Sequence, residues 1–562
     1  MKKIMKYMLV VFVAGGLLNS CDTTELDLRT SPNDLAADQA DPNLLLNSIQ
    51  FSYVQNMVEF NDRGSETTRI DYMGGRDYFN NYPGATFNGI WSRTYSSGGT
   101  GVGSGVSVGI LTNLNTLESI NNDSEVNYNF HVGIGKVMYA HQLLLLVDYL
   151  GKAAFSQAGN PEEFPAPTLD DGPAVYAAAL GLLDEAEGLL SGDAPTLGAT
   201  DFFYGGDAAK WIKAINSIRL KAYVTTNDTA GFNAVIAGNN FISATEDDFQ
   251  FQFGSRELQP DTRHQDYAGD YTPSGVGPYK SNWLMETMDD KNDPRIRYYF
   301  YRQEPGTPGA LDIDGNPVPP SEETLACSLV VPPQHYLDGG YTFCSADNGY
   351  WGRSHGNDEG TPPDGFVKTG VGVYPAAGRF DDNSFDVVGL GLGGGGVGIE
   401  PIILASWVDF WRADMAASDT DRATFMRAAM VKSIAKVQSF GALDGNADKS
   451  FEPTAAEVTA YIDGIVADFN AATGDDKEDI FAEQYWIDMW GGGAEAINYY
   501  RKTGYPTTLT PNWELNPGPF PRSFLIPQNE VVTNPNLTQK TTLTEQVFWD
   551  SNPASPAFPP AN

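Results

Sequence analysis

Cys21 has the most readily assigned chemistry in this sequence, because an export signal stands directly before it. A start with three lysines leads into an apolar run over residues 8–18, and Leu18-Asn19-Ser20 then precede the thiol. The apolar run is shorter than the roughly 20 residues that span a bilayer. The pattern predicts a lipoprotein signal peptide over residues 1–20 and lipid attachment at Cys21, with a plain secreted protein as the alternative.

Histidines, which serve many catalytic and metal sites, are scattered along the chain. They are His131, His141, His264, His335 and His355. None has the His-Glu-x-x-His spacing of a zinc enzyme, and no cysteine pair has zinc-site spacing. The histidines therefore do not indicate a catalytic centre.

Two glycine motifs resemble known active-site signatures without completing them. Gly105-Val106-Ser107-Val108-Gly109 has the spacing of a nucleophile elbow, but no convincing strand precedes it. Gly133-Ile134-Gly135-Lys136 is no P-loop, because Val137 stands where a serine or threonine would bind magnesium. The 72 acidic residues offer no pair whose spacing would identify a glycosidase. We predict that the chain is not an enzyme, with a surface-anchored hydrolase as the alternative.

Two short acidic segments have oxygen ligands that suit calcium. Asp312 and Asp314 lie in Asp-Ile-Asp-Gly-Asn, whereas Asp444 and Asp448 lie in Asp-Gly-Asn-Ala-Asp. Neither segment completes a calcium loop with a closing glutamate, and such sequences more often form plain turns. We predict no metal or other cofactor, with calcium at these aspartates as the alternative.

Cys327 and Cys344 are the only cysteines beyond the lipid acceptor. Outside the cytoplasm such a pair can form a disulfide that stabilises a long loop. We predict that the two are bridged, with two unconnected thiols as the alternative.

Aromatic side chains in loops are candidates for binding a sugar, whose apolar face stacks on a ring. Tyr350 and Trp351 lead these candidates because they stand among glycine, asparagine and arginine. Tyr78, Trp91 and Tyr374 are further candidates. The alternative is structural, with the Tyr350–Trp351 pair holding its loop against the protein body and Trp91 packed in the core.

Apolar residues recur at three- and four-residue spacing in long segments, which predicts a mainly helical fold. The expected helices cover residues 131–149, 173–190, 207–226, 401–417, 421–440, 454–472 and 480–500. Neighbouring helices would stack as pairs.

Residues 303–400 are rich in glycine and proline and predict a loop-rich, partly β insertion, with short strands near 329–331 and 367–374. A polar, acidic stretch over 21–41 predicts a flexible tether. We therefore expect one large domain over residues 42–562, including this insertion.

The formal net charge of −37 opposes binding to nucleic acid and to anionic membrane surfaces. No nucleic-acid partner is predicted.

Several segments resemble, in order, the SusD/RagB nutrient-binding outer-membrane lipoproteins of Bacteroidota, in their SusD-like branch. The opening segments are 31–34 and 41–45, followed by Asp148-Tyr149-Leu150-Gly151, 155–156 and 167–170. Tyr204-Gly205-Gly206-Asp207-Ala208-Ala209-Lys210-Trp211 with 216–221 is the most specific segment, and Asp293-Pro294-Arg295 and 501–506 come after it. The similarity runs to about residue 536 and covers the 303–400 insertion poorly. The chain departs from the family at Ser406–Trp411 and at Ala413-Asp414, where members usually have Tyr-x-Glu and Ala-Glu-Ala.

The resemblance implies a fold of tetratricopeptide-like helix pairs, held by a lipid on the outer membrane and facing the cell exterior. Such proteins catalyse no reaction. They act as the lid of a SusC-type TonB-dependent transporter and capture an oligosaccharide or a peptide for it. A structural lid with little ligand affinity of its own is a further alternative.

Overall fold

The computed structural model describes residues 40–96, 109–305, 331–344, 346–359 and 364–561. The chain divides into two compact units, Met1–Asp41 and Pro42–Asn562. The first unit lies outside the described residues apart from Ala40 and Asp41, so Cys21 and the expected tether are not described. The helices and strands of the described residues all belong to the second unit.

Helices dominate this unit, as the sequence predicts. In chain order they are α2 (Pro42–Thr67), α3 (Tyr78–Asn81), α4 (Asn88–Tyr95), α5 (Ile110–Asp123), α6 (Asn129–Leu150), α7 (Gly172–Ser191), α8 (Ala208–Thr226), α9 (Thr229–Gly238), α10 (Gln265–Asp270), α11 (Asn282–Asp290), α12 (Ile296–Tyr299), α13 (Gln334–Gly339), α14 (Ala405–Asp414), α15 (Asp419–Ser439), α16 (Ala455–Ala471), α17 (Asp475–Asp488), α18 (Ala496–Thr503) and α19 (Gln528–Thr533). The expected helices over 131–149, 173–190, 207–226, 421–440 and 454–472 correspond to α6, α7, α8, α15 and α16.

Strands are short, and among the described residues they pair only in twos. The antiparallel pairs are β1 (Lys152–Ala153) with β2 (Asp170–Asp171), β3 (Phe249–Gln252) with β6 (Ile399–Ile403), and β4 (Phe300–Tyr301) with β5 (Gly370–Val371). The mainly α fold is therefore confirmed.

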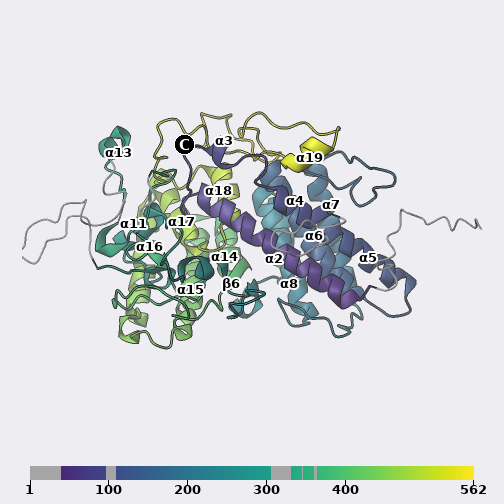
Figure 1. The fold of residues 1–562 in the computed structure, drawn as a ribbon, viewed down its shortest axis with the longest axis horizontal. Coiled ribbons are helices and arrows are strands. Elements are labelled where there is room, and N and C mark those ends of the chain that lie inside the picture. The colour runs from purple at the N-terminus through teal and green to yellow at the C-terminus, as the bar shows by residue number, and fades with distance from the viewer. Residues whose placement is uncertain (1–39, 97–108, 306–330, 345, 360–363, 562) are drawn as a thin grey trace, which may run out of the picture. The chain divides into compact units, whose positions relative to one another are not determined.

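Helix α6 is the centre of the N-terminal half, where it packs against α2, α5 and α7 (Figure 1). It is apolar on all sides, and every residue from Phe130 to Leu150 is buried. A helix that is apolar all round belongs in a core or a membrane. By length and composition α6 alone among the described helices could cross a membrane, but its most apolar window is wholly enclosed by protein. It is the core helix around which the neighbouring helices pack.

A buried polar network joins α6 to α8 and α18 through the Asp148 carboxylate. Its Oδ2 atom accepts hydrogen bonds from Lys221 Nζ and Asn498 Nδ2, each at 2.7 Å. Its Oδ1 atom accepts from Trp549 Nε1 at 3.1 Å. Arg501 Nη2 donates to the backbone carbonyl of Asp148 at 2.7 Å. These residues come from segments far apart in sequence, so the network holds distant parts of the fold together.

Two other motif positions have local structural roles. Asp207 caps α8, since its carboxylate accepts from the backbone N–H groups of Ala209 and Lys210 at 3.0 and 3.3 Å. Asp293 and Arg295 form a buried ion pair with an Nη2–Oδ2 distance of 2.6 Å. These segments of the family resemblance therefore serve the scaffold.

The expected continuous helix over 480–500 is wrong. Helix α17 ends at Asp488, and α18 begins only at Ala496. Gly491 between them has φ of +85°, a conformation that ends a right-handed helix. At Gly492 a Cβ atom would lie 2.2 Å from the Trp407 ring, so a side chain there would clash.

The expected helix over 401–417 is wrong in its first turn, and the insertion has less strand than expected. Residues 399–403 form β6, which pairs with β3, and α14 starts at Ala405. In the expected strand over 367–374, only Gly370–Val371 is in a strand. Residues 329–330 lie outside the described part of the chain, and Val331 is not in a strand.

Candidate functional site

A cavity of about 560 Å³ lies between α4, the start of α5, the 154–169 loop and the C-terminal segment around α19. Figure 1 places α19, from the end of the chain, beside α4, and the two helices are in contact. The site is therefore assembled from segments that are hundreds of residues apart.

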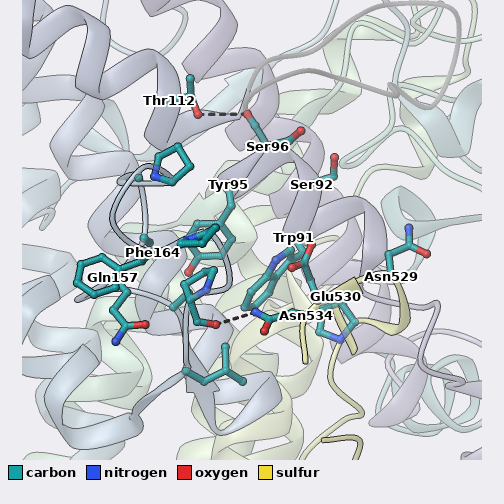
Figure 2. A pocket seen from close by; sticks show the side chains of 18 of the residues that line it. Trp91, Ser92, Tyr95, Ser96, Thr112, Gln157, Phe164, Asn529, Glu530 and Asn534 are labelled. Atoms are coloured by element: carbon teal, nitrogen blue, oxygen red, sulfur yellow. Dashed lines mark hydrogen bonds between the residues drawn. The ribbon is translucent and has the colours of Figure 1, made fainter. Parts of the chain in front are cut away.

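Aromatic rings form part of the cavity wall. Trp91 and Tyr95 are four residues apart on α4, so they share one face of the helix, and their ring centroids are 4.6 Å apart. Trp91 is only 5% exposed, whereas Tyr95 and Phe164 are half-buried. Tyr95 and Phe164 thus offer the larger ring surfaces, and Trp91 packs beside Tyr95 (Figure 2).

Amide and hydroxyl groups make up most of the polar lining. They belong to Asn88, Ser92, Ser96, Thr112, Asn115, Thr116, Gln157, Asn529 and Asn534. Four prolines also line the cavity, namely Pro161, Pro165, Pro167 and Pro527. This combination of rings, amides and hydroxyls can stack on an apolar face and exchange hydrogen bonds with hydroxyl groups.

Hydrogen bonds hold the 154–169 loop in place. Asp170 accepts from the backbone N–H groups of Phe155 and Ser156 at 2.9 and 2.8 Å. Asn534 Nδ2 donates to the Pro167 carbonyl at 2.7 Å, which ties the loop to the C-terminal segment (Figure 2). These hydrogen bonds fix the loop that forms this part of the wall.

Glu530 on α19 is the one acidic or basic residue among the described lining residues that can be charged near neutral pH. Burial raises the pKa of its carboxyl group, and a hydrogen bond from the Trp91 side chain partly opposes that rise. Burial also raises the pKa of Tyr95 well above its usual value, and the nearby carboxylates of Asp170 and Glu530 contribute to the rise. The Tyr95 phenol therefore stays neutral beside one acidic group.

Comparison with known proteins decides the family. Residues 32–316 match the SusD-like family, which is described as starch-binding and associating with the outer membrane. The chain belongs to the SusD-like family. The resemblance drawn from the sequence motifs is thereby confirmed, although no curated protein matches the sequence.

Solved structures share the SusD-like fold over nearly the whole chain. A SusD/RagB family protein from Bacteroides thetaiotaomicron has a TM-score of 0.64 and 17% identity, with 92% of this chain and 100% of that one covered. A chitin-binding protein has a TM-score of 0.59 and 16% identity, with coverage of 91% and 100%. A chitin-binding SusD homologue from Flavobacterium johnsoniae has a TM-score of 0.56 and 16% identity, with coverage of 91% and 99%. At these identities the likeness shows the fold.

Of the ligand-binding candidates drawn from the sequence, Trp91 is the one that lines this cavity. Tyr350 lines a different cleft of about 850 Å³, where the Arg302 guanidinium lies 4.8 Å from its ring centroid. Trp351 is buried in a small cluster with Cys344. Neither residue lines the cavity beside α4, and ligand contact by either one stays a prediction.

Tyr78 and Tyr374 are enclosed in the main core. Arg69 Nη1 donates to the Tyr78 hydroxyl at 2.9 Å, and Tyr374 stacks on Tyr299 with ring centroids 5.6 Å apart. Both rings are packed by protein and line neither of these two cavities.

Sequence reasoning missed Phe164, Glu530 and the amides of the C-terminal segment. The run from Pro161 to Pro167 has a visible signal, because prolines crowd around one aromatic residue. Residues 528–534 have no such signal, since only the folded chain brings them to α4.

The acidic segments that suit calcium have structural roles where the chain is described. In the described part of the chain, no three histidine, cysteine, aspartate or glutamate side chains are arranged to hold a metal. Asp444 Oδ2 accepts from the Phe380 backbone N–H at 3.0 Å, and Asp448 caps a short 3₁₀ turn. Asp312 and Asp314 lie outside the described residues.

The glycine motifs and the cysteine pair are described in part. Residues 105–108 of the elbow-like motif lie outside the described residues, whereas 133–136 are buried inside α6. There Lys136 pairs with Glu185 at 2.7 Å instead of facing a phosphate site. Cys344 is disulfide-bonded, and its partner lies outside the described residues, so the pairing with Cys327 stays a prediction.

Proposed function

We propose that this SusD-like protein binds an oligosaccharide in the cavity beside α4 and passes it to an outer-membrane transporter without catalysing a reaction. The observation that supports this function is the pair of half-buried rings, Tyr95 and Phe164, among amide and hydroxyl groups. A sugar offers an apolar face for the rings and hydroxyl groups for the amides. The cavity volume of about 560 Å³ lies within the roughly 300–1,000 Å³ typical of small-molecule sites.

A peptide is the alternative ligand, and the charge of the lining favours the glycan. Peptide termini and side chains bring charges of both signs that need partners when they leave water. Among the described lining residues only Glu530 carries such a charge. Two of the similar structures are named as chitin-binding, which makes N-acetylated oligosaccharides a suitable class of probe.

The proposed partner is a SusC-type TonB-dependent transporter, for which this protein would be the lid. Support comes from the family description, which associates its members with the outer membrane. In this proposal residues 1–20 are removed, lipid on Cys21 holds the protein at the cell surface, and residues 21–41 form a tether that lets the domain over 42–562 open and close.

A panel of neutral oligosaccharides and short peptides, titrated into the mature protein by calorimetry, tests the binding function. We expect heat with at least one neutral oligosaccharide and no shortening of that oligosaccharide afterwards. Heat with peptides alone would contradict the glycan proposal. Released product would support the surface-anchored hydrolase, and no heat with any probe would support the structural lid.

Cys21→Ser in the full-length chain tests the anchor. In cells without the transporter we expect the variant to leave the membrane fraction, because the lipid has no attachment site, while the purified protein still binds oligosaccharide. Ser20→Ala is the matched control, since it keeps a small residue before the thiol and should stay with the membrane. A Cys21→Ser protein that remains in the membrane fraction would contradict the lipid anchor.

A further inference from the structure

The cavity beside α4 has an unusual charge balance, because its described lining has a carboxylate and no cation. Glu530 is acidic, and none of the described lining residues is lysine, arginine or histidine. Residues 97–108, which come after α4 in the sequence and are not described, include no charged residue at all. That segment therefore adds no charge to the site, wherever it lies.

Further carboxylates surround the site. The Asp170 carboxylate, like that of Glu530, contributes to the raised pKa of the Tyr95 phenol. Glu162 and Glu163 are exposed on the loop between the lining residues Pro161 and Phe164. The local potential is thus negative, in keeping with the net charge of −37 for the whole chain.

The basic residues nearest to the lining in sequence bind groups away from it. Lys540, three residues after Leu537, donates from Nζ to the Leu150 carbonyl and the Ser523 hydroxyl, each at 2.7 Å. Arg93 is two residues from Trp91 on α4, but it is buried and pairs with Glu59 at 2.6 Å. Lys152 pairs with Asp171 at 2.8 Å. None of these three residues lines the cavity.

We propose that the cavity selects uncharged oligosaccharides and rejects acidic ones, such as uronate-containing glycans, with Glu530 as the residue that determines this selectivity. The inference rests on the proposed glycan-binding function and adds the substrate class to it. A uronate that enters the cavity gives up water and meets a partly desolvated carboxylate, with no cation in the described lining to compensate. A neutral sugar at the same place meets amides and hydroxyls that can exchange hydrogen bonds with its own hydroxyl groups.

The test compares matched neutral and acidic probes in the mature protein. Maltohexaose and N-acetylchitohexaose are the neutral probes, and maltohexaose oxidised at C6 is the acidic one. We expect the oxidised probe to bind at least about tenfold more weakly than maltohexaose at low salt. The gap should narrow in 0.5 M NaCl, because salt shortens the range of charge repulsion.

Glu530→Gln keeps the size of the side chain and an oxygen that accepts from the Trp91 indole, and it removes the charge. The readout is the ratio of the two affinities, which we expect to fall to about threefold or less. Asp193→Asn is the matched control. It also removes one negative charge, from an exposed position that does not line the cavity, and should leave the ratio unchanged.

The outcomes separate this inference from the function on which it rests. If maltohexaose and its oxidised form bind equally well, the selectivity is wrong and the glycan-binding function stands. If the gap persists in Glu530→Gln, another group sets the selectivity and the assignment to Glu530 fails. If none of the three probes binds, the proposed function falls, and the selectivity falls with it.

Discussion

Asp148→Ala is expected to lower the free energy of unfolding by about 3–5 kcal/mol, the cost of removing one partner of a buried ion pair. The Asp148 and Lys221 side chains are both fully buried, 2.7 Å apart. Burial acts to lower the pKa of Lys221, but the carboxylates of Asp148 and Glu495 raise it overall, so the lysine is charged in the folded protein. The variant leaves that charge with Glu495 alone, at 3.3 Å.

Urea unfolding of the mature protein, monitored by tryptophan fluorescence, measures the decrease in the free energy of unfolding. Asp148→Asn keeps the volume and one acceptor oxygen, and should lie between the wild type and Asp148→Ala if the alanine variant folds too poorly to measure. Asp171→Ala is the matched control. Asp171 also pairs with a lysine at 2.8 Å, but its side chain is 76% exposed, and such pairs contribute at most about 1 kcal/mol. Equal losses for Asp148→Ala and Asp171→Ala would show that the buried network does not stabilise the fold.

Five long helices, α6, α7, α8, α15 and α16, could be predicted because their apolar spacing is local information, whereas α2, the longest described helix, was not among the expected helices. Helix α8 shows this clearly, since Asp207 caps it and Trp211, four residues on, is in the core. The prediction of one helix over residues 480–500 is wrong for a different reason. Its apolar spacing continues across Gly491, but a left-handed backbone there ends the helix and lets Gly492 pack against the Trp407 ring.

The prediction that the helix begins at residue 401 is wrong because strand pairing depends on residues far away in the sequence. Residues 399–403 pair with β3, which lies about 150 residues earlier in the chain, and nothing in the apolar spacing of the segment distinguishes that strand from a first helical turn. Long-range pairing therefore overrode a plausible local pattern.

The candidate site could be predicted only in part, because its residues also come from segments far apart in the sequence. Trp91 could be singled out by its residue type, but the side chains around it come from the 154–169 loop and from residues 527–537. In loop-rich sequence no periodicity shows which rings face solvent. Tyr374 therefore had the same signal as Trp91, although it is stacked in the core. That Tyr95 and Phe164 line a cavity follows only from the folded structure, in which the C-terminal segment forms part of the same wall.

Tyr95→Ala is expected to weaken binding of the neutral oligosaccharides by roughly 10- to 100-fold, which corresponds to about 1.4–2.8 kcal/mol. The size reflects the loss of one stacked ring, worth about 0.5–1.5 kcal/mol beyond the apolar area that it buries at roughly 25 cal/mol per Å². Trp91→Phe should have a smaller effect, because Trp91 is 5% exposed and acts mainly by supporting Tyr95 and donating to Glu530.

Calorimetry measures both the affinity and the number of sites, so a folded variant with a poor site is distinguished from a partly unfolded sample. Trp351→Phe is the matched control, since Trp351 is as buried as Trp91 but packs with Cys344, away from the cavity lining. It should bind oligosaccharide like the wild type. Loss of binding in Trp351→Phe with normal binding in Tyr95→Ala would move the site to the loop-rich insertion, because ring stacking contributes to affinity only where the ring meets the sugar.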